Sequence, residues 1–320
     1  MNLSDLVVEQ WAEGIQCLQL PMPAFGGVNA FIVGAAKRHT IIDTGMPGAE
    51  TKAVWQAVLR DRPLHDVEAV LCTHAHIDHL GQVGMLVATT GAPLLMSAEE
   101  HEDAVFLTST SPAKRDILAR ALLEQGGFGA DGAQLMDYSI LDPFPEAVLL
   151  QDGVEIELGG IAFEVIVGGG HSRAPICLLS RERKLLLAGD QVLRASGPQV
   201  PIQAERPQDD PLGAYFNFLD RFDALPDDLV VFPGHGGPIH GFKDQLARIR
   251  ADHHLRLERL LERLSGAMTC AEMAPLVFPD PSRRLAARLP YLMLAMTNYL
   301  VAQSRLRVCT ESGTSRYRKE

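Results

Sequence analysis

The sequence contains no long apolar run and few cysteines. No stretch approaches the roughly 20 apolar residues that a transmembrane helix requires, so we expect no membrane-bound form. The first 14 residues carry three acidic side chains and no basic start, which argues against a secretory signal. The five cysteines are scattered and form no CxxC pair, which argues against a disulfide framework. Together these absences favour a reducing, cytoplasmic location.

A motif for a nucleophilic serine or cysteine is also missing. The sequence contains no GxSxG, and no separate base near Cys72 in the chain is signalled that would activate its thiol. We therefore expect no covalent mechanism through either residue type.

Basic residues are sparse in most of the chain and concentrated near its end. The net charge is −11 at pH 7, but residues 1–243 carry 16 basic and 32 acidic side chains, whereas residues 244–320 carry 13 and 8. This difference predicts a catalytic domain at 1–243 and a smaller C-terminal domain at 244–320. A basic tail suits nucleic-acid binding or a solvated helical face. We favour the solvated face, because the whole molecule would repel a polyanion.

The most unusual stretch places three histidines and an aspartate within six residues: His74, His76, Asp78 and His79. An apolar, strand-like run precedes it, and a helix is predicted over 80–89. Open α/β sheets usually bind ligands where a buried strand ends. Two histidines that are two residues apart can point to one side of an extended turn. Imidazole nitrogen and carboxylate oxygen are ligands that zinc and similar cations prefer, so the stretch predicts a metal site.

Further strand ends carry similar side chains beside small residues. His171 follows three glycines, Asp190 follows Gly189, and His235 follows Gly234. Each histidine alone would be unremarkable, but strand ends of one sheet layer can converge, so together with the first cluster they predict one site. Asp43 ends another strand, and we expect its carboxylate to orient a ligand histidine. The remaining histidines lack this context and are expected to be ordinary surface or loop residues: His39, His65, His101, His240, His253 and His254.

Strand-like and helix-like runs alternate along the chain. Strands are predicted at 14–20, 28–33, 40–42, 67–72, 93–96, 148–151, 154–158, 161–167, 176–179, 185–188 and 229–232, and helices at 49–60 and 215–222. Residues 97–145 are predicted to be a helical insertion, with Ser97 as its N-cap and Glu100 completing a capping box. This insertion either lies over the site and shapes a pocket or forms a peripheral pair of helices.

The motif His74-x-His76-x-Asp78-His79, with Asp43-Thr44-Gly45 before it and His171, Asp190 and His235 after it, closely resembles that of the metallo-β-lactamase fold superfamily of metallohydrolases. The resemblance covers roughly residues 14–241. It implies an α/β fold, an αββα sandwich with a dinuclear metal site at the rim between two sheets. It also implies that His74, His76 and His171 bind one metal, that Asp78, His79 and His235 bind the other, and that Asp190 bridges them.

The C-terminal region carries a second, weaker resemblance. A long helix is predicted at 245–264, a capping box of Thr269 and Glu272 opens a short helix, and Pro290 is placed at the start of a third helix at 291–304. Residues 306–317 are predicted to form a small hairpin or wing. This arrangement resembles the winged-helix-like C-terminal domain of the β-lactamase-like-2 subgroup, which includes an endoribonuclease and many uncharacterised bacterial hydrolases.

Two cations that share a bridging water lower its pKa towards neutrality. We therefore predict a hydrolase that uses two divalent ions and a bridging hydroxide on a small ester, thioester, lactone or amide, with Asp78 and Asp190 as catalytic as well as ligand residues. Zn²⁺ is favoured, and iron and manganese are alternatives. Arg173 and Arg194 lie near ligands in the sequence and are candidate contacts for an anionic group of the substrate, with solvated arginines as the alternative.

Three other functions remain as alternatives. The basic tail suits an endoribonuclease, although the long flexible arm of tRNA 3′-processing relatives is not visible. A mono-iron oxygenase of the persulfide dioxygenase type shares much of the motif. A non-catalytic binding protein could keep the fold, but the complete ligand set argues against it. A small molecule is therefore the favoured partner over nucleic acid, and the sequence leaves the oligomeric state open.

Overall fold

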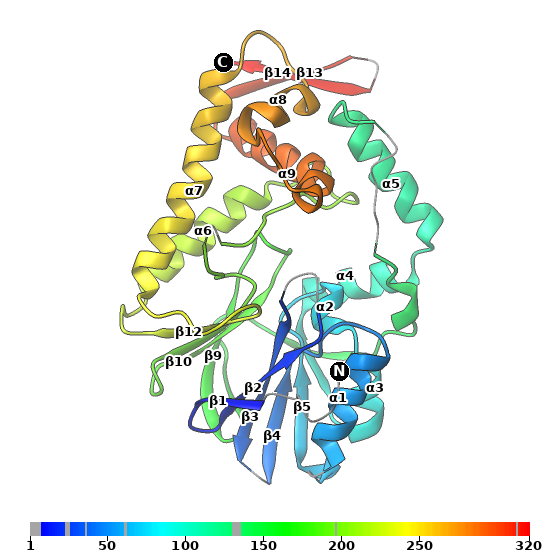
Figure 1. The fold of residues 1–320 in the computed structure, drawn as a ribbon, viewed down its shortest axis with the longest axis vertical. Helices are drawn as coiled ribbons and strands as arrows, with labels where there is room; N and C mark the ends of the chain where they lie inside the picture. Colours follow the sequence, from blue (N-terminus) through cyan, green and yellow to red (C-terminus); the bar gives the residue numbers. More distant parts are fainter. Residues whose placement is uncertain are drawn as a thin grey trace.

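Two β-sheets packed face to face form the centre of the protein, and helices cover their outer faces (Figure 1). The computed structural model describes residues 8–22, 26–35, 37–60, 63–129, 136–195, 197–311 and 313–320. The first seven residues, on which half of the prediction about a secretory signal rests, lie outside this range. Within it, no helix is both long and apolar enough to cross a membrane.

The larger sheet has seven strands in chain order. They are β1 (Val8–Ala12), β2 (Ile15–Leu20), β3 (Val28–Ala35), β4 (Arg38–Ile42), β5 (Val67–Leu71), β6 (Leu94–Ser97) and β7 (Ala147–Leu150). The strands are antiparallel up to β4 and parallel from β4 to β7. Parallel neighbours need crossover connections, and α1 (Ala49–Arg60) and α3 (Val83–Thr90) lie in two of them. Trp55 of α1 is fully buried against the outer face of this sheet.

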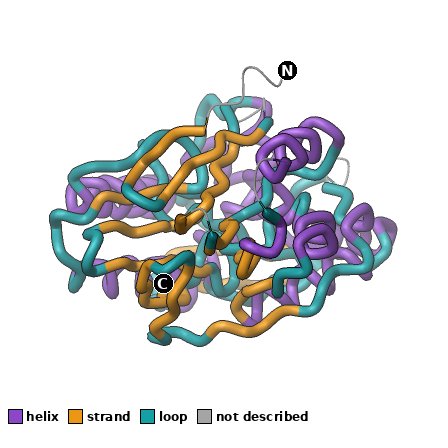
Figure 2. The backbone as a smooth tube through the Cα atoms, turned by 90° about the horizontal axis from the view of Figure 1, so that it is seen from below, coloured by secondary structure: helices purple, strands orange, loops and turns teal. Residues whose placement is uncertain are grey.

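The smaller sheet has the order β12 (Val230–Pro233), β11 (Leu185–Gly189), β10 (Ile176–Ser180), β9 (Ile161–Val167) and β8 (Glu155–Leu158). Every residue of β10 and β11 is buried, as expected for apolar strands covered on both faces. Phe31 of β3 packs with Phe163 and Phe232 between the sheets. Helix α6 (Pro211–Asp223) covers the outer face of the smaller sheet, and the flanking layers of helix are visible in Figure 2.

The insertion contains α4 (Ala98–Ser109), α5 (Pro112–Gln125) and a short 3-10 turn (Ser139–Leu141). The N-cap prediction for α4 is confirmed, because the Ser97 hydroxyl accepts from the Glu100 amide. The predicted capping box is wrong, because the Glu100 carboxylate accepts from two amides elsewhere. Helix α4 packs against β6 and β7, whereas α5 packs against C-terminal elements. Helix α4 therefore contacts the larger sheet, and α5 contacts the C-terminal region.

The C-terminal region consists of α7 (Phe242–Arg263), α8 (Cys270–Val277), α9 (Arg283–Ala302) and a hairpin of β13 (Leu306–Glu311) and β14 (Thr314–Lys319) (Figure 1). The predicted capping box of Thr269 and Glu272 is present. The prediction that Pro290 starts the last helix is wrong, since Pro290 lies inside α9. The true start is capped by Ser282, whose hydroxyl accepts from the Leu285 amide.

The C-terminal helices share one apolar core with the smaller sheet. Side chains of α7, α8 and α9 belong to the same buried cluster as α6 and β11. Helix α7 begins at Phe242, next to the predicted boundary at 243, but the division into two domains remains a prediction. Two short helices complete the description of the chain: a 3-10 turn (Leu64–Asp66) before β5 and α2 (Ile77–Leu80) after it.

Candidate metal centre

The predicted ligand side chains meet at one rim of the sandwich. His74 and His76 lie in the turn after β5, and Asp78 and His79 lie in α2. The other three follow strands of the smaller sheet: His171 after β9, Asp190 after β11 and His235 after β12. The expectation that the strand ends belong to one sheet layer is wrong, because the side chains come from both sheets. Convergence at the rim matches the family resemblance instead.

Asp190 occupies the middle of this group. Its Oδ2 lies 3.4 Å from Nε2 of His171 and 3.4 Å from Nε2 of His235, and its Oδ1 lies 3.6 Å from Nε2 of His79. Asp78 lies beside His235, with Oδ2 3.3 Å from Nε2 of that histidine. His74 and His76 lie beside each other, with Nε2 of His74 3.0 Å from Nδ1 of His76.

Four of the five predicted ligand histidines have a protein partner on Nδ1, the ring nitrogen that faces away from the centre. Nδ1 of His79 donates to Asp43 at 2.8 Å, Nδ1 of His171 to the Gln199 carbonyl at 2.8 Å, and Nδ1 of His235 to the Gly27 carbonyl at 2.8 Å. Nδ1 of His74 lies 3.0 Å from the Thr73 hydroxyl. These bonds fix the ring orientations and direct the Nε2 atoms of these four histidines inwards.

Asp43, which the sequence predicts to orient a ligand histidine, contacts His79 and the turn after β5. Besides His79, its carboxylate accepts from the amide and the hydroxyl of Thr73. Its φ of 59° is unusual for a residue with a side chain, and its own amide donates to the Leu71 carbonyl. Strained backbone of this kind persists where surrounding contacts hold it, commonly at functional sites. Asp43 therefore orients His79 and ties β4 to the turn after β5.

The group has the properties of a metal site. Nε2 of His79, Nε2 of His171 and Oδ1 of Asp190 are buried with no hydrogen-bond partner among the described residues. A Cβ added to Gly234 would lie 2.2 Å from Oδ1 of Asp190, so only glycine leaves room there. Three triads each hold their ligand atoms within 4.8 Å of one another: His74, His76 and His171; His74, His79 and Asp190; Asp78, His79 and His235. The donor set fits two divalent cations.

The histidines of the site fall into two groups, one neutral and one protonated. Burial lowers the pKa of His74 and His171, and lowers that of His76 to about 3, so these rings are neutral. Burial also opposes the charged forms of His79 and His235, but the neighbouring carboxylates outweigh it and raise their pKa values to about 9 and about 11. The metal-free chain therefore carries protons on these two histidines at neutral pH.

Metal binding at pH 7 is expected to release protons. His79 and His235 must lose theirs before they can ligate, so loading with Zn²⁺ should release about two protons per chain from these histidines, besides any from a bound water. Affinity should rise with pH, steeply below about 9 and less steeply between about 9 and about 11. Isothermal titration calorimetry in buffers of different ionisation enthalpy measures this number. A binding enthalpy that does not depend on the buffer would contradict it.

Glu100 supports the site in a way that the sequence did not indicate. It is fully buried in α4, and its carboxylate accepts from the Ala75 amide at 2.7 Å and the Ala174 amide at 2.6 Å. Ala75 lies between His74 and His76, and Ala174 follows His171 closely in the chain. One carboxylate thus joins the two ligand-bearing turns. The contact joins distant parts of the chain, so the position of Glu100 near a strand end is the only feature of the sequence that could have suggested this role.

Two other supporting residues were also missed. The Asn29 side chain, buried in β3, donates to the carbonyls of Pro233 and Gly236 and holds the turn that carries His235. The Tyr138 hydroxyl, from the insertion, accepts from the Ile77 amide at the start of α2 at 3.1 Å. Both contacts join segments that are remote in sequence.

The two arginines proposed as substrate contacts are engaged elsewhere. Arg173 forms ion pairs with Glu102 and Asp103 of α4 at 2.8 Å and 3.0 Å. Arg194 donates to the carbonyls of Gly237 and Pro238. A role in substrate binding remains a prediction for each, but these contacts favour a structural role.

Two histidines and one cysteine lie in surroundings that bear on what the sequence predicts for them. Two of the histidines assigned to the surface or loops are buried within regular elements, His39 in β4 and His253 in α7, so that assignment is wrong for them. The His253 ring packs against the rings of Tyr215 and Phe216, and a lone histidine carries no sequence mark of such burial. Burial raises the pKa of the Cys72 thiol well above its usual value, which agrees with the absence of a cysteine nucleophile.

Comparison with known proteins agrees with this geometry. Residues 23–235 match the family model of the metallo-beta-lactamase superfamily. Among curated proteins, the chain is 27% identical over 222 residues to hydroxyacylglutathione hydrolase GloC of Haemophilus influenzae, covering 68% of this chain and 89% of that protein. It is 27% identical over 180 residues to acyl-coenzyme A thioesterase MBLAC2 of Bos taurus, covering 52% of this chain and 59% of that protein.

Solved structures extend the similarity to the C-terminal helices. A beta-lactamase domain protein from Burkholderia ambifaria has a TM-score of 0.83 at 24% identity, covering 100% of this chain and 96% of that one. A metallo-beta-lactamase family protein from Thermus thermophilus has a TM-score of 0.82 at 25% identity, covering 97% of this chain and 99% of that one. Both likenesses concern the fold.

Proposed function

This chain belongs to the metallo-beta-lactamase superfamily and is a metal-dependent hydrolase, and on that premise we propose that it uses a dinuclear centre to cleave a small thioester or ester. The observation that carries the proposal is the group of seven side chains, Asp190 and the six around it, with three buried polar atoms that no described residue satisfies. Zn²⁺ is the favoured metal for this mixture of imidazole and carboxylate, with iron and manganese as alternatives.

The proposal assigns each of the seven side chains to one or both ions. His74, His76 and His171 would hold one ion, Asp78, His79 and His235 would hold the other, and Asp190 would lie between them. Two ions so placed supply an activated water at neutral pH and polarise the substrate carbonyl. In thioester hydrolysis, the water oxygen bonds to the acyl carbon, the C–S bond breaks, and the proton from water ends on the departing sulfur. Asp78, the more exposed of the two aspartates, is placed to carry that proton.

Two observations favour an acyl substrate. The relatives that align with this chain include a protein named as a hydroxyacylglutathione hydrolase and another named as an acyl-coenzyme A thioesterase, and both names describe thioester cleavage. The described part of the chain also offers no activated serine or cysteine in contact with the site, so the attacking oxygen comes from water. Lactones and amides remain secondary candidates.

The basic C-terminal region does not favour an RNA substrate. Several of its arginines are paired with carboxylates: Arg250 with Asp220 and Asp223, Arg256 with Asp252, Arg305 with Glu258, Arg307 with Glu320, and Arg316 with Glu272. Carboxylates beside these guanidinium groups lower the positive potential that a polyanion would meet. We therefore keep the endoribonuclease of the β-lactamase-like-2 type, with its winged-helix-like domain, as the second candidate only.

Free cysteines in the buried core support a reducing, cytoplasmic setting.

The test of this proposal is a substrate screen with metal-loaded protein. We expect chain loaded with Zn²⁺ to release thiol from acyl thioesters, detected with a thiol reagent, and to lose this activity on chelation and recover it on reloading. A β-lactam, a lactone and an RNA hairpin serve as comparison substrates. Cleavage of the RNA without cleavage of any thioester or ester would replace the proposal by its second candidate.

A further inference from the structure

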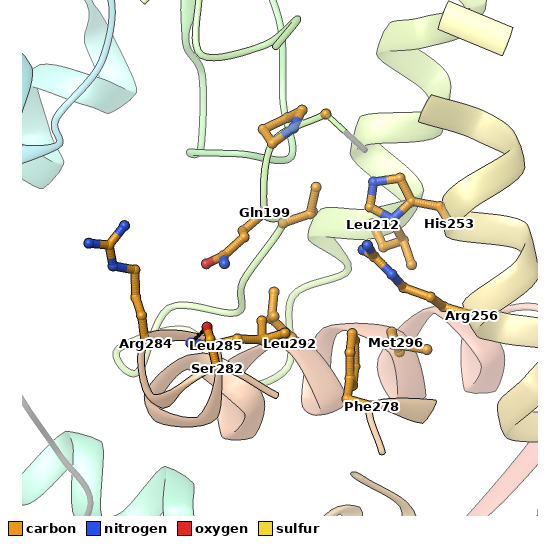
Figure 3. A pocket seen from close by; sticks show the side chains of 13 residues that line it. Gln199, Leu212, His253, Arg256, Phe278, Ser282, Arg284, Leu285, Leu292 and Met296 are labelled. Atoms are coloured by element: carbon orange, nitrogen blue, oxygen red, sulfur yellow. Dashed lines mark hydrogen bonds between the residues drawn. The ribbon is translucent and has the colours of Figure 1, made fainter. Parts of the chain in front are cut away.

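A cavity of about 210 Å³ lies directly beside the candidate metal centre. The two share Gln199: its carbonyl accepts from Nδ1 of His171, while its side chain lines the cavity (Figure 3). The loop 197–200 forms one wall of the cavity, and the C-terminal helices form the opposite wall. Gln199 therefore links the cavity to His171, one of the seven side chains of the candidate centre.

The walls of this cavity are largely apolar. Besides Gln199 they include Val200, Leu212 of α6, Phe278, and Leu292 and Met296 of α9. All but Phe278 among these apolar side chains are buried. Polar side chains also line the cavity: His253, Arg256, Ser282 and Arg284. Arg256 is paired with Asp252 at 2.5 Å and lies over the Phe278 ring at 5.5 Å, so its charge is already balanced. The apolar part of the lining suits hydrocarbon.

We propose that this cavity holds the apolar acyl chain of the substrate, so that the C-terminal helix α9 sets the chain-length preference of the enzyme. The inference rests on the proposed acyl-hydrolase function and adds the subsite that distinguishes one acyl group from another. A volume of 210 Å³ holds roughly seven groups the size of a water molecule or a methylene. The preferred acyl group is therefore of medium length, about eight carbons including the carbonyl.

The test uses N-acetylcysteamine thioesters, a series in which only the acyl chain changes, from acetyl to dodecanoyl. Each buried methylene is worth about fourfold in binding. Octanoyl is six methylenes longer than acetyl, so we expect kcat/KM of the Zn²⁺-loaded protein to rise about a thousandfold between them and to fall beyond decanoyl. A flat profile across the series would overturn the proposal.

Variants of the wall separate the cavity from the metal centre. Met296→Trp fills it and is expected to lower kcat/KM for octanoyl about tenfold or more while acetyl stays within about twofold. Leu292→Ala enlarges it and is expected to move the optimum to a longer chain, which also covers the case in which the tryptophan variant fails to fold. The control is Leu255→Trp, on the exposed face of α7, which should leave the profile unchanged. Equal losses for acetyl and octanoyl in Met296→Trp, with no shift in Leu292→Ala, would contradict the assignment.

A binding measurement distinguishes failure of this inference from failure of the proposed function. If the loaded protein cleaves no thioester or ester at all, the function proposed above is wrong. The cavity is then tested through the binding of octanoate itself, measured by isothermal titration calorimetry. Binding that Met296→Trp abolishes and Leu255→Trp retains would support an acyl-chain site, and absence of binding to the unmodified chain would overturn it.

Discussion

Replacing Asp190 by asparagine is expected to lower kcat/KM for thioester hydrolysis by about a thousandfold or more with the fold intact. Asp190 is the side chain that approaches histidines of both halves of the site, within 3.4 Å of His171 and of His235. Asparagine keeps its shape but removes the negative charge that two cations share. The loss should therefore appear as reduced metal content and reduced activity together, while the circular dichroism spectrum is unchanged.

The matched control for this variant is Asp116→Asn. Asp116 lies on the exposed side of α5 and pairs with Arg120 four residues on, an interaction worth about 0.3–0.5 kcal/mol. It should behave as the unmodified protein in both assays. His76→Ala removes a predicted ligand of the half formed with His74 and His171 and should match Asp190→Asn in activity. Full hydrolysis by either site variant would contradict the assignment of the centre.

Replacing Glu100 by leucine is expected to destabilise the protein by about 3–5 kcal/mol. The substitution leaves the buried amides of Ala75 and Ala174 without an acceptor, and each such amide costs about 1–3 kcal/mol, more when the lost partner is charged. Because these amides belong to the turns that carry His74, His76 and His171, the variant should also bind metal more weakly. Urea unfolding and zinc titration measure the two effects.

Glu102 offers the control on the same helix. Its carboxylate is largely exposed and pairs with Arg173 at 2.8 Å, so Glu102→Gln should change stability by less than about 1 kcal/mol. Glu100→Gln gives an intermediate case, since its carbonyl can accept from one amide while its NH₂ group opposes the other. If Glu100→Leu proved as stable as Glu102→Gln, the account of Glu100 as the link between the two turns would fail.

The parts that could be predicted from the sequence are those encoded over short distances. Apolar runs between glycines located most strands, and the spacing of His74, His76, Asp78 and His79 identified the chemistry, because such donors rarely gather within six residues for packing reasons. The caps at Ser97 and Thr269 were also predictable, since a cap joins residues three apart.

What could not be predicted depends on contacts between remote segments. Glu100 has the sequence context of a capping box, yet its carboxylate accepts from amides 25 residues before it and 74 residues after it. Pro290 has the mark of a helix start, but α9 begins at the cap of Ser282 and buries the proline within its packed face. The cavity beside Gln199 exists only because α9 returns to the loop at 197–200. In each case a tertiary contact decided between options that the local sequence left equal.

The most direct measurement of the central claim is the metal content of the purified protein, given as moles of each element per chain. The arrangement of seven predicted ligand side chains, Asp190 and the six around it, predicts about two divalent ions, either zinc alone or zinc with iron or manganese. A single iron would point to the mono-iron oxygenase instead. No bound metal, and none taken up on reconstitution at about pH 8, would contradict the dinuclear centre and the function built on it.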